Sequence, residues 1–372
     1  MVNIATLRGA AQASARSSSS VSFTTLQAGR AIAAIAVVFF HAHVFFLPER
    51  LHPGQSVSPV FDMGYSGVEF FFVLSGFIMF LVHRRDIGQR GAGLRFLVKR
   101  VLRILPFYWC VLLGLIALTL LGLGSARLDL ARALHAAFLL PMADGSPLLI
   151  EPAWTLTHEF LFYGFFALIL FLPRAGAAVF VAWQLATAAL SVGGDAAYPL
   201  STLFGTHNLL FPMGMLAAWA YPKFELRGAR IAAILGVLGF LVVGLGDVFD
   251  VLSFSREART VLFGAFAMLG VAGVARLESG GALGAGRAMV FLGDASYAIY
   301  LVHGLALALL TKVMLALGLG QVLPPALTLL ILVVGAMATG VLAHLVVERP
   351  LLRWLRTRVM RPRRSGGLVP GE

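Results

Sequence analysis

Charged residues are scarce in this chain. Only 12% of its 372 residues are Asp, Glu, Lys or Arg, whereas 59% are hydrophobic and the mean hydropathy is +0.89. A soluble domain needs a largely polar and charged surface, so this composition excludes an ordinary soluble protein. We therefore expect an all-α fold, a polytopic bundle of transmembrane helices.

Cysteine is nearly absent. Cys110 is the only one in the sequence, which excludes a disulfide framework and a cysteine-based metal site. The chain also lacks the strict alternation of apolar and polar residues that is typical of a membrane β-barrel. His41 and His43 are closely spaced, but two residues apart on a helix they point away from each other, so we expect no metal site.

Long apolar runs predict about ten transmembrane helices. Because that number is even, both termini are expected on the same side of the membrane, the cytoplasmic side. The predicted spans are residues 26–47, 64–82, 102–122, 154–172, 176–193, 201–220, 231–249, 259–275, 290–316 and 323–346.

Acidic residues are outnumbered by basic ones, 17 to 29, which gives a net charge of +12. With both termini inside, 23 of the 29 basic residues lie on the cytoplasmic side of the predicted spans, as the positive-inside rule requires. Topology and attraction to anionic membrane lipids therefore explain the excess charge. Nucleic acid is not an expected partner, because no aromatic–basic patch or binding motif accompanies the charge.

The chain divides into three segments. Residues 1–22 are predicted to be a disordered cytoplasmic tail, 23–350 the transmembrane domain, and 351–372 a basic, partly amphipathic cytoplasmic tail. The first segment is rich in Ser, Ala and Arg and has no acid, a composition shared with organellar transit peptides. The bacterial type of topology favours a short tail instead. The start of the last segment is expected to lie along the inner membrane surface.

Arg30 and His41 stand eleven residues apart on the first predicted span, and residues 31–40 between them are all non-polar. Eleven steps of about 100° bring the two side chains to one helix face, about 16 Å apart along the axis. Ionisable groups inside a membrane are costly and usually functional. His43 is rotated by about 200° from His41, so we expect it to contribute little.

Three ionisable side chains on three spans have similar predicted depths. His41, Glu69 and Glu159 each lie five or six residues from the outer end of their span. We therefore predict a polar chamber in which the imidazole takes a hydroxyl proton and a carboxylate orients it. One buried histidine or glutamate can also be purely structural, but three at one depth favour a functional site.

Four further side chains are candidates for substrate contact. Tyr300 and His303 are one turn apart and share a face of the ninth span, and we expect both to enter the chamber. Trp154 and Tyr163 are expected either to line a sugar or lipid path or to belong to the interfacial aromatic belt. Glu348 is expected to form a helix-end ion pair with the residue that follows it.

Six motifs occur in the order typical of one family, and together they extend over about residues 26–356. The motifs are Arg30-x10-His41, GVEFFFVLSGF at 67–77, Arg100-x-x-Arg103 with PFYW at 106–109, WTLTHEFLFY at 154–163, SYAIYLVH at 296–303 and VERP at 347–350. With these motifs the chain resembles the membrane acyltransferase-3 family, especially its exopolysaccharide O-acetyltransferase branch.

The resemblance implies an acyl donor, usually acetyl-CoA, bound from the cytoplasm. Arg30, Arg100 and Arg103 match the family's arginines, and Lys99 and Arg349 belong to the same basic face. Guanidinium groups form paired hydrogen bonds with phosphates, so we expect these five cations to hold the donor. The alternative is that they only set the topology.

The sequence thus predicts an O-acetyltransferase of a bacterial inner membrane that acts on a polysaccharide or lipid-linked glycan. His41, which matches the family's intramembrane histidine, would be the general base or a transient acyl carrier, with Glu159 as its orienting partner and Glu69 as a third member of the chamber. The family often has Asp at the position of Glu69, which makes the role of that residue less certain. The rival hypothesis is a proton-coupled transporter in which the His/Glu layer relays protons; inverted repeats would favour it, and none is evident.

The predicted topology can be tested with reporter fusions. A reporter after residue 372 and one inserted in the 123–153 loop should lie on opposite sides of the membrane, because basic residues are concentrated on the side of the termini. Reporters active on the same side would rule out the ten-span arrangement.

Overall fold

The chain folds into a helical assembly. The computed structural model describes residues 23–124, 127–142, 144–192 and 198–359, and within these ranges all regular structure is helical. The predicted tail 1–22 lies outside the described residues, as do residues 360–372 of the predicted C-terminal tail. The expected all-α fold is confirmed for the described part of the chain.

The helices of the first half include two short ones, one in the long loop 123–153 and one at the start of the sixth predicted span. They are α2 (Thr24–His41), α3 (Gly67–His83), α4 (Ala92–Leu120), α5 (Leu130–Ala137), α6 (Trp154–Phe171), α7 (Pro173–Val192) and α8 (Leu200–Leu203).

The second half has the same character, with long helices and one short connecting helix. They are α9 (Leu210–Ala220), α10 (Leu226–Val248), α11 (Arg256–Ser279), α12 (Arg287–Ala316), α13 (Leu319–Val322), α14 (Pro325–Ala343) and α15 (Arg349–Val359).

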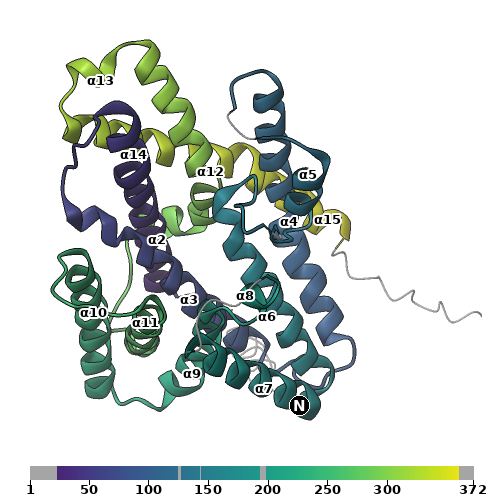
Figure 1. The fold of residues 1–372 in the computed structure, drawn as a ribbon. Coiled ribbons are helices and arrows are strands. Elements are labelled where there is room, and N and C mark those ends of the chain that lie inside the picture. The colour runs from purple at the N-terminus through teal and green to yellow at the C-terminus, as the bar shows by residue number, and fades with distance from the viewer. Residues whose placement is uncertain (1–22, 125–126, 143, 193–197, 360–372) are drawn as a thin grey trace, which may run out of the picture.

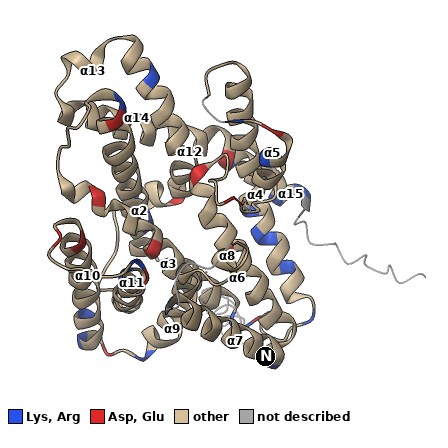
Figure 2. Cartoon of the chain, in the orientation of Figure 1, with Lys and Arg blue, Asp and Glu red and all other residues tan. Residues whose placement is uncertain are grey.

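Eight helices among the described residues are long and apolar enough to cross a membrane. Figure 2 shows why: charged positions are sparse along the helices, although several basic ones follow one another on α4. The predicted span 176–193 corresponds to α7, but the predicted span 201–220 is divided into α8, a 3₁₀ turn and the short α9. The side-chain amide of Asn208 bonds the carbonyl oxygens of Thr202 and Leu203, which stabilises this break.

The helix α2 occupies the centre of the assembly. It packs against α12 and α3, while α12 also packs on α14 and α10 pairs with α11. Figure 1 shows α10 and α11 together on one flank of α2 and α3, with α4 and α6 on the other. The first helix therefore contacts groups of helices that are distant in sequence, which places its polar residues inside the bundle.

Glycines permit the closest contact between α3 and α9. A Cβ on Gly76 would lie 2.0 Å from the carbonyl oxygen of Phe211, and one on Gly214 would lie 1.9 Å from that of Val73. Small residues are the usual means by which membrane helices approach one another.

A partly buried network anchors the amino end of α2. Glu278, near the end of α11, accepts hydrogen bonds from the backbone N–H groups of Thr24 and Thr25 at 2.6 and 3.0 Å, and from both threonine hydroxyls. A carboxylate at this position satisfies free N–H groups and interacts favourably with the helix dipole. The orientation of α2 is thus tied to α11.

After His41 the helix widens, since Ala42–Leu51 forms a π-helical segment that contains Pro48. His43 lies in this segment, is 3% exposed and donates from Nδ1 to Asp62 Oδ1 at 2.6 Å. Its Nε2 accepts from the backbone N–H groups of Val57 and Ser58 at 3.0 and 3.3 Å. His43 therefore has a structural role that the sequence did not predict, because this ring holds the following loop in place.

We expect the variant His43→Ala to lower the free energy of unfolding by about 1–3 kcal/mol, because it removes a buried ring and leaves two partly buried backbone donors without an acceptor. Thermal unfolding in detergent would measure the loss. The variant His41→Ala is the matched comparison, since the one hydrogen bond of the His41 side chain among the described residues is within its own helix. Equal stability of the two variants would contradict this role of His43.

Candidate functional site

Three arginines converge on one cavity among α2, α3, α4, α6 and α12. This cavity, the arginine pocket, has a volume of about 170 Å³. Arg30, Arg100 and Arg103 line it together with Glu159 and the aromatic residues Tyr163, Tyr297 and Tyr300. Three of the five predicted donor-binding cations therefore share a single cavity, although they come from two different helices.

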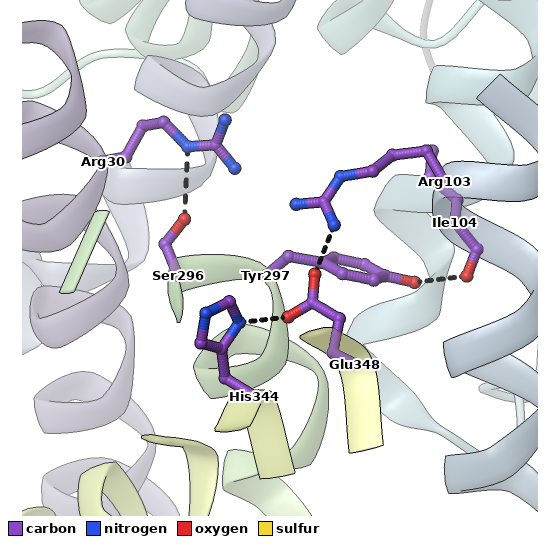
Figure 3. Close-up of polar contacts among 7 residues, drawn as sticks. All are labelled: Arg30, Arg103, Ile104, Ser296, Tyr297, His344 and Glu348. Carbon is purple, nitrogen blue, oxygen red and sulfur yellow. Dashed lines mark hydrogen bonds and ion pairs between the residues drawn. The ribbon is translucent and has the colours of Figure 1, made fainter. Parts of the chain in front are cut away.

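Arg103 is held by a carboxylate from the far end of the chain. Its Nη1 lies 2.5 Å from Glu348 Oε1, and the other oxygen of Glu348 accepts from His344 Nδ1 at 2.7 Å (Figure 3). Glu348 is completely buried, which requires such partners. The expected ion pair of Glu348 with Arg349 is wrong: Arg349 is exposed, and the carboxylate instead fixes Arg103.

Aromatic rings and polar groups orient the other two guanidinium groups. Arg30 donates from Nε to Ser296 Oγ at 3.2 Å (Figure 3). Arg100 lies over the rings of Phe96 and Tyr163, at 5.6 and 5.9 Å from their centroids. Its buried Nε has no hydrogen-bond partner. Within the described residues neither Arg30 nor Arg100 forms an ion pair, so the pocket keeps an excess of positive charge.

Glu159 is fixed inside the arginine pocket. Its Oε1 accepts from Ser75 Oγ at 3.0 Å and from the hydroxyl of Tyr163. The contact between Ser75 and Glu159 was not predicted from the sequence. No spacing rule relates these two residues, because they are 84 positions apart.

A second cavity contains two imidazole rings. This histidine pocket has a volume of about 350 Å³ and is lined by His41 and His303, whose ring centroids are 4.7 Å apart. Charged side chains of Glu49, Arg50, Glu151 and Lys312 also line it. The described residues include no group of three or more metal-ligating side chains placed to hold a metal ion.

The two pockets lie end to end along the bundle. Each of four helical segments contributes to the arginine pocket at one end and to the histidine pocket at the other. The residues that line the arginine pocket are Arg30 of α2, Arg100 and Arg103 of α4, Glu159 of α6, and Tyr297 and Tyr300 of α12. The same segments line the histidine pocket through His41, Phe45 and Glu49 of α2 and its continuation, Val111 and Leu115 of α4, Glu151 just before α6, and His303 and Lys312 of α12.

Tyr300 stands at the boundary between these pockets. It lines the arginine pocket, its hydroxyl donates to the carbonyl oxygen of Pro152 at 3.4 Å, and its ring centroid is 5.8 Å from that of His303. Pro152 and His303 both line the histidine pocket. Of the predicted substrate contacts, Tyr163 and Tyr300 thus belong to the arginine pocket and His303 to the histidine pocket.

The structure does not bring the three predicted chamber residues together. His41 lines the histidine pocket and Glu159 the arginine pocket, whereas Glu69 lies 3.8 Å from His207 Nε2 and lines neither. The sequence supplied the depth of each residue along its helix but not the direction in which its side chain points. Residues at one depth can therefore face different neighbours.

The remaining predicted residues are at the periphery. Trp154 is 37% exposed and packs on the rings of His158 and His207, with centroids 5.7 and 5.0 Å away. Lys99 and Arg349 are exposed. None of these three lines either of the two pockets described above.

Comparison with known proteins gives the family. The sequence is 35% identical over 328 residues to the exopolysaccharide production protein ExoZ of Rhizobium meliloti (strain 1021), an alignment that covers 82% of this chain and 95% of the relative. No solved structure matches the chain. Residues 23–345 match the family model described as an acyltransferase domain. That match covers most of the chain, including the residues that line both pockets. This protein is therefore a multi-pass membrane acyltransferase of the acyltransferase-3 family.

Proposed function

We propose that this protein is an O-acetyltransferase of a bacterial inner membrane, which moves an acetyl group from cytoplasmic acetyl-CoA to a hydroxyl of an exopolysaccharide or its lipid-linked precursor. The observation that carries the proposal is the end-to-end arrangement of an arginine-rich pocket and a pocket with two imidazoles. The first suits a polyanionic donor, and the second suits the removal of a proton. The relative's role in exopolysaccharide production supports the choice of acceptor.

The arginine pocket fits the phosphates of a coenzyme A thioester. Arg30 and Arg100 form no ion pair among the described residues, and Arg100 Nε is a buried donor without a partner. A bound phosphate would satisfy such donors. Lys99 and Arg349, which are exposed, would add long-range attraction at the cytoplasmic entrance. This orientation requires both termini in the cytoplasm, as the distribution of basic residues predicts.

His41 has the geometry of a general base. Its Nδ1 lies 2.9 Å from the carbonyl oxygen of Val37, so the ring proton is on Nδ1 and the lone pair is on Nε2. In the proposed reaction the acceptor oxygen bonds to the acetyl carbon while His41 Nε2 takes the hydroxyl proton. The thioester C–S bond then breaks, and the proton passes to the thiolate. The products are the acetyl ester and free CoA.

The two glutamates of the predicted chamber have different places in this proposal. Glu159 lies in the donor pocket, where its bonds to Ser75 and Tyr163 fix a negative charge close to the arginines. Glu69 lines neither pocket, so we assign it no step. We assign Trp154 to contact with the acceptor at the periphery of the site. The transporter hypothesis is not favoured, because the family to which the chain belongs transfers acyl groups.

The variant His41→Ala tests the reaction. We expect the purified variant to fold and to lower turnover by about 10²–10⁴-fold, the usual effect of removing a positioned acid–base group. Turnover is measured as CoA released from acetyl-CoA in the presence of a glycan acceptor. Undiminished release by this variant would remove His41 from the mechanism, and a wild-type protein that releases no CoA would contradict the proposed activity itself.

The variant Arg100→Ala tests the donor pocket. We expect a higher KM for acetyl-CoA with a nearly unchanged kcat, because phosphate contacts stabilise the ground state and the transition state alike. Arg100→Lys should recover only part of the affinity, since the paired hydrogen bonds are lost. Arg103 is a less suitable target, because its removal takes from the buried Glu348 one of its two partners.

Arg95→Ala is the matched control. Arg95 lies on the same helix, is exposed and bonds only a backbone oxygen of the preceding loop. An equal rise of the KM for acetyl-CoA in both variants would contradict a specific role of Arg100 in donor binding. The arginines would then serve only to set the membrane topology.

A further inference from the structure

His303 is an unusual buried residue. It is fully buried on α12, and its Nδ1 lies 2.5 Å from the carbonyl oxygen of Tyr300. This contact places the ring proton on Nδ1 and leaves the lone pair on Nε2. Nε2 is buried and has no hydrogen-bond partner in the part of the chain that the structure describes. Leaving a buried acceptor unsatisfied costs free energy, so this nitrogen calls for a functional explanation.

His41 presents the same arrangement from the other side of the cavity. Its Nδ1 also bonds a carbonyl oxygen of its own helix, four residues earlier. The two rings are in contact, with centroids 4.7 Å apart and planes at 63°. The histidine pocket therefore holds two imidazoles whose free lone pairs are both on Nε2, contributed by α2 and α12.

Four charged side chains line the histidine pocket beside these two rings. Glu49 and Arg50 come from the π-helical segment after α2, Glu151 from the turn before α6 and Lys312 from α12. The ammonium group of Lys312 donates a hydrogen bond to the carbonyl oxygen of Leu123. Among the described residues, neither His41 nor His303 forms an ion pair with a carboxylate. The nitrogen base in contact with each of these two rings is the ring of the other histidine.

We propose that His41 and His303 act as one proton-sharing imidazole pair, which takes up a single proton when the acceptor hydroxyl attacks the thioester. The inference rests on the proposed function and deepens it. As the new C–O bond forms, the hydroxyl proton moves to Nε2 of one ring, and the resulting N–H donates to Nε2 of the other. After the C–S bond breaks, the same proton moves to the thiolate, so the pair returns to its neutral state.

This pair supplies what a carboxylate supplies in a catalytic triad. An imidazolium is stabilised by a hydrogen-bond acceptor placed beside it, and the unsatisfied nitrogen of His303 becomes satisfied only in the protonated state. The interaction therefore strengthens during the reaction, and this is the condition under which an interaction accelerates it. A purely structural histidine would instead have both nitrogens satisfied in the resting protein.

Nitrogen NMR of the full chain in detergent, labelled with ¹⁵N-histidine, tests the pair without measuring the reaction. The chain has nine histidines, and single variants assign the resonances. On acidification, the Nε2 signals of His41 and His303 should shift together, and His303→Asn should displace the interval in which His41 titrates. Independent titration of the two rings, or an unchanged His41 signal in the variant, overturns the proposal.

Turnover supplies the second measurement. His303→Asn keeps an amide donor for the carbonyl of Tyr300 but has no nitrogen base, and we expect kcat for CoA release to fall by about 10²-fold with an unchanged KM for acetyl-CoA. The double variant with His41→Ala should lose little more than His41→Ala alone, as expected for residues that act as a unit. Losses that multiply would overturn the proposal.

Thr311→Val is the matched control, because Thr311 is another fully buried residue of α12 whose side-chain oxygen has no partner. It should leave turnover and the histidine signals unchanged, and a loss equal to that of His303→Asn would show only damage to α12. The two measurements also separate the hypotheses. Coupled histidine signals in a protein that releases no CoA would contradict the acetyl transfer and leave the pair standing.

Discussion

A charge buried in an apolar bundle must have a partner, and the pair of Arg103 and Glu348 is where this constraint organises the site. Glu348 is completely buried and has two partners, Arg103 and His344. Such pairs add little net stability, because removing both charges from water is costly. Losing one partner is far more harmful than never having had the pair. The contact therefore fixes the position of the segment between α14 and α15 relative to α4, and it holds one wall of the arginine pocket in place.

The two pockets are linked through rigid elements. Arg30 and His41 are on one helix, and Ser296, Tyr300 and His303 follow one another on α12, which packs beside it. Because a helix has a fixed rise per residue, the separation between donor-side arginines and the imidazoles is set by these two helices. The anchor of α2 on Glu278 extends the same rigidity to its amino end. Chemistry at this site thus depends on helix packing and little on loops.

The sequence predicted most long helices because membrane helices require uninterrupted apolar runs. It also placed the arginines correctly on one side of His41, since spacing along a helix translates directly into distance. It failed where a side chain's direction depends on packing: Glu69, Glu159 and His41 have similar depths but face different surroundings. The hydrogen bonds of His43 with Asp62 and with the backbone of residues 57 and 58 were not predicted, because they depend on how the chain folds back after the π-helical segment. The bond between Arg103 and Glu348 joins residues 245 positions apart, and no local pattern predicts it.

The position of Glu348 has a consequence for how the family's boundaries are used. The match to the acyltransferase domain ends at residue 345, three residues before this carboxylate. A fragment cut at that boundary would retain Arg103 and His344 but lose the group that lies between them. In its arginine pocket, Arg103 would then lack its counter-charge. The smallest unit able to fold around this site must therefore continue through Glu348, so the physical domain is longer than the region that sequence similarity delimits.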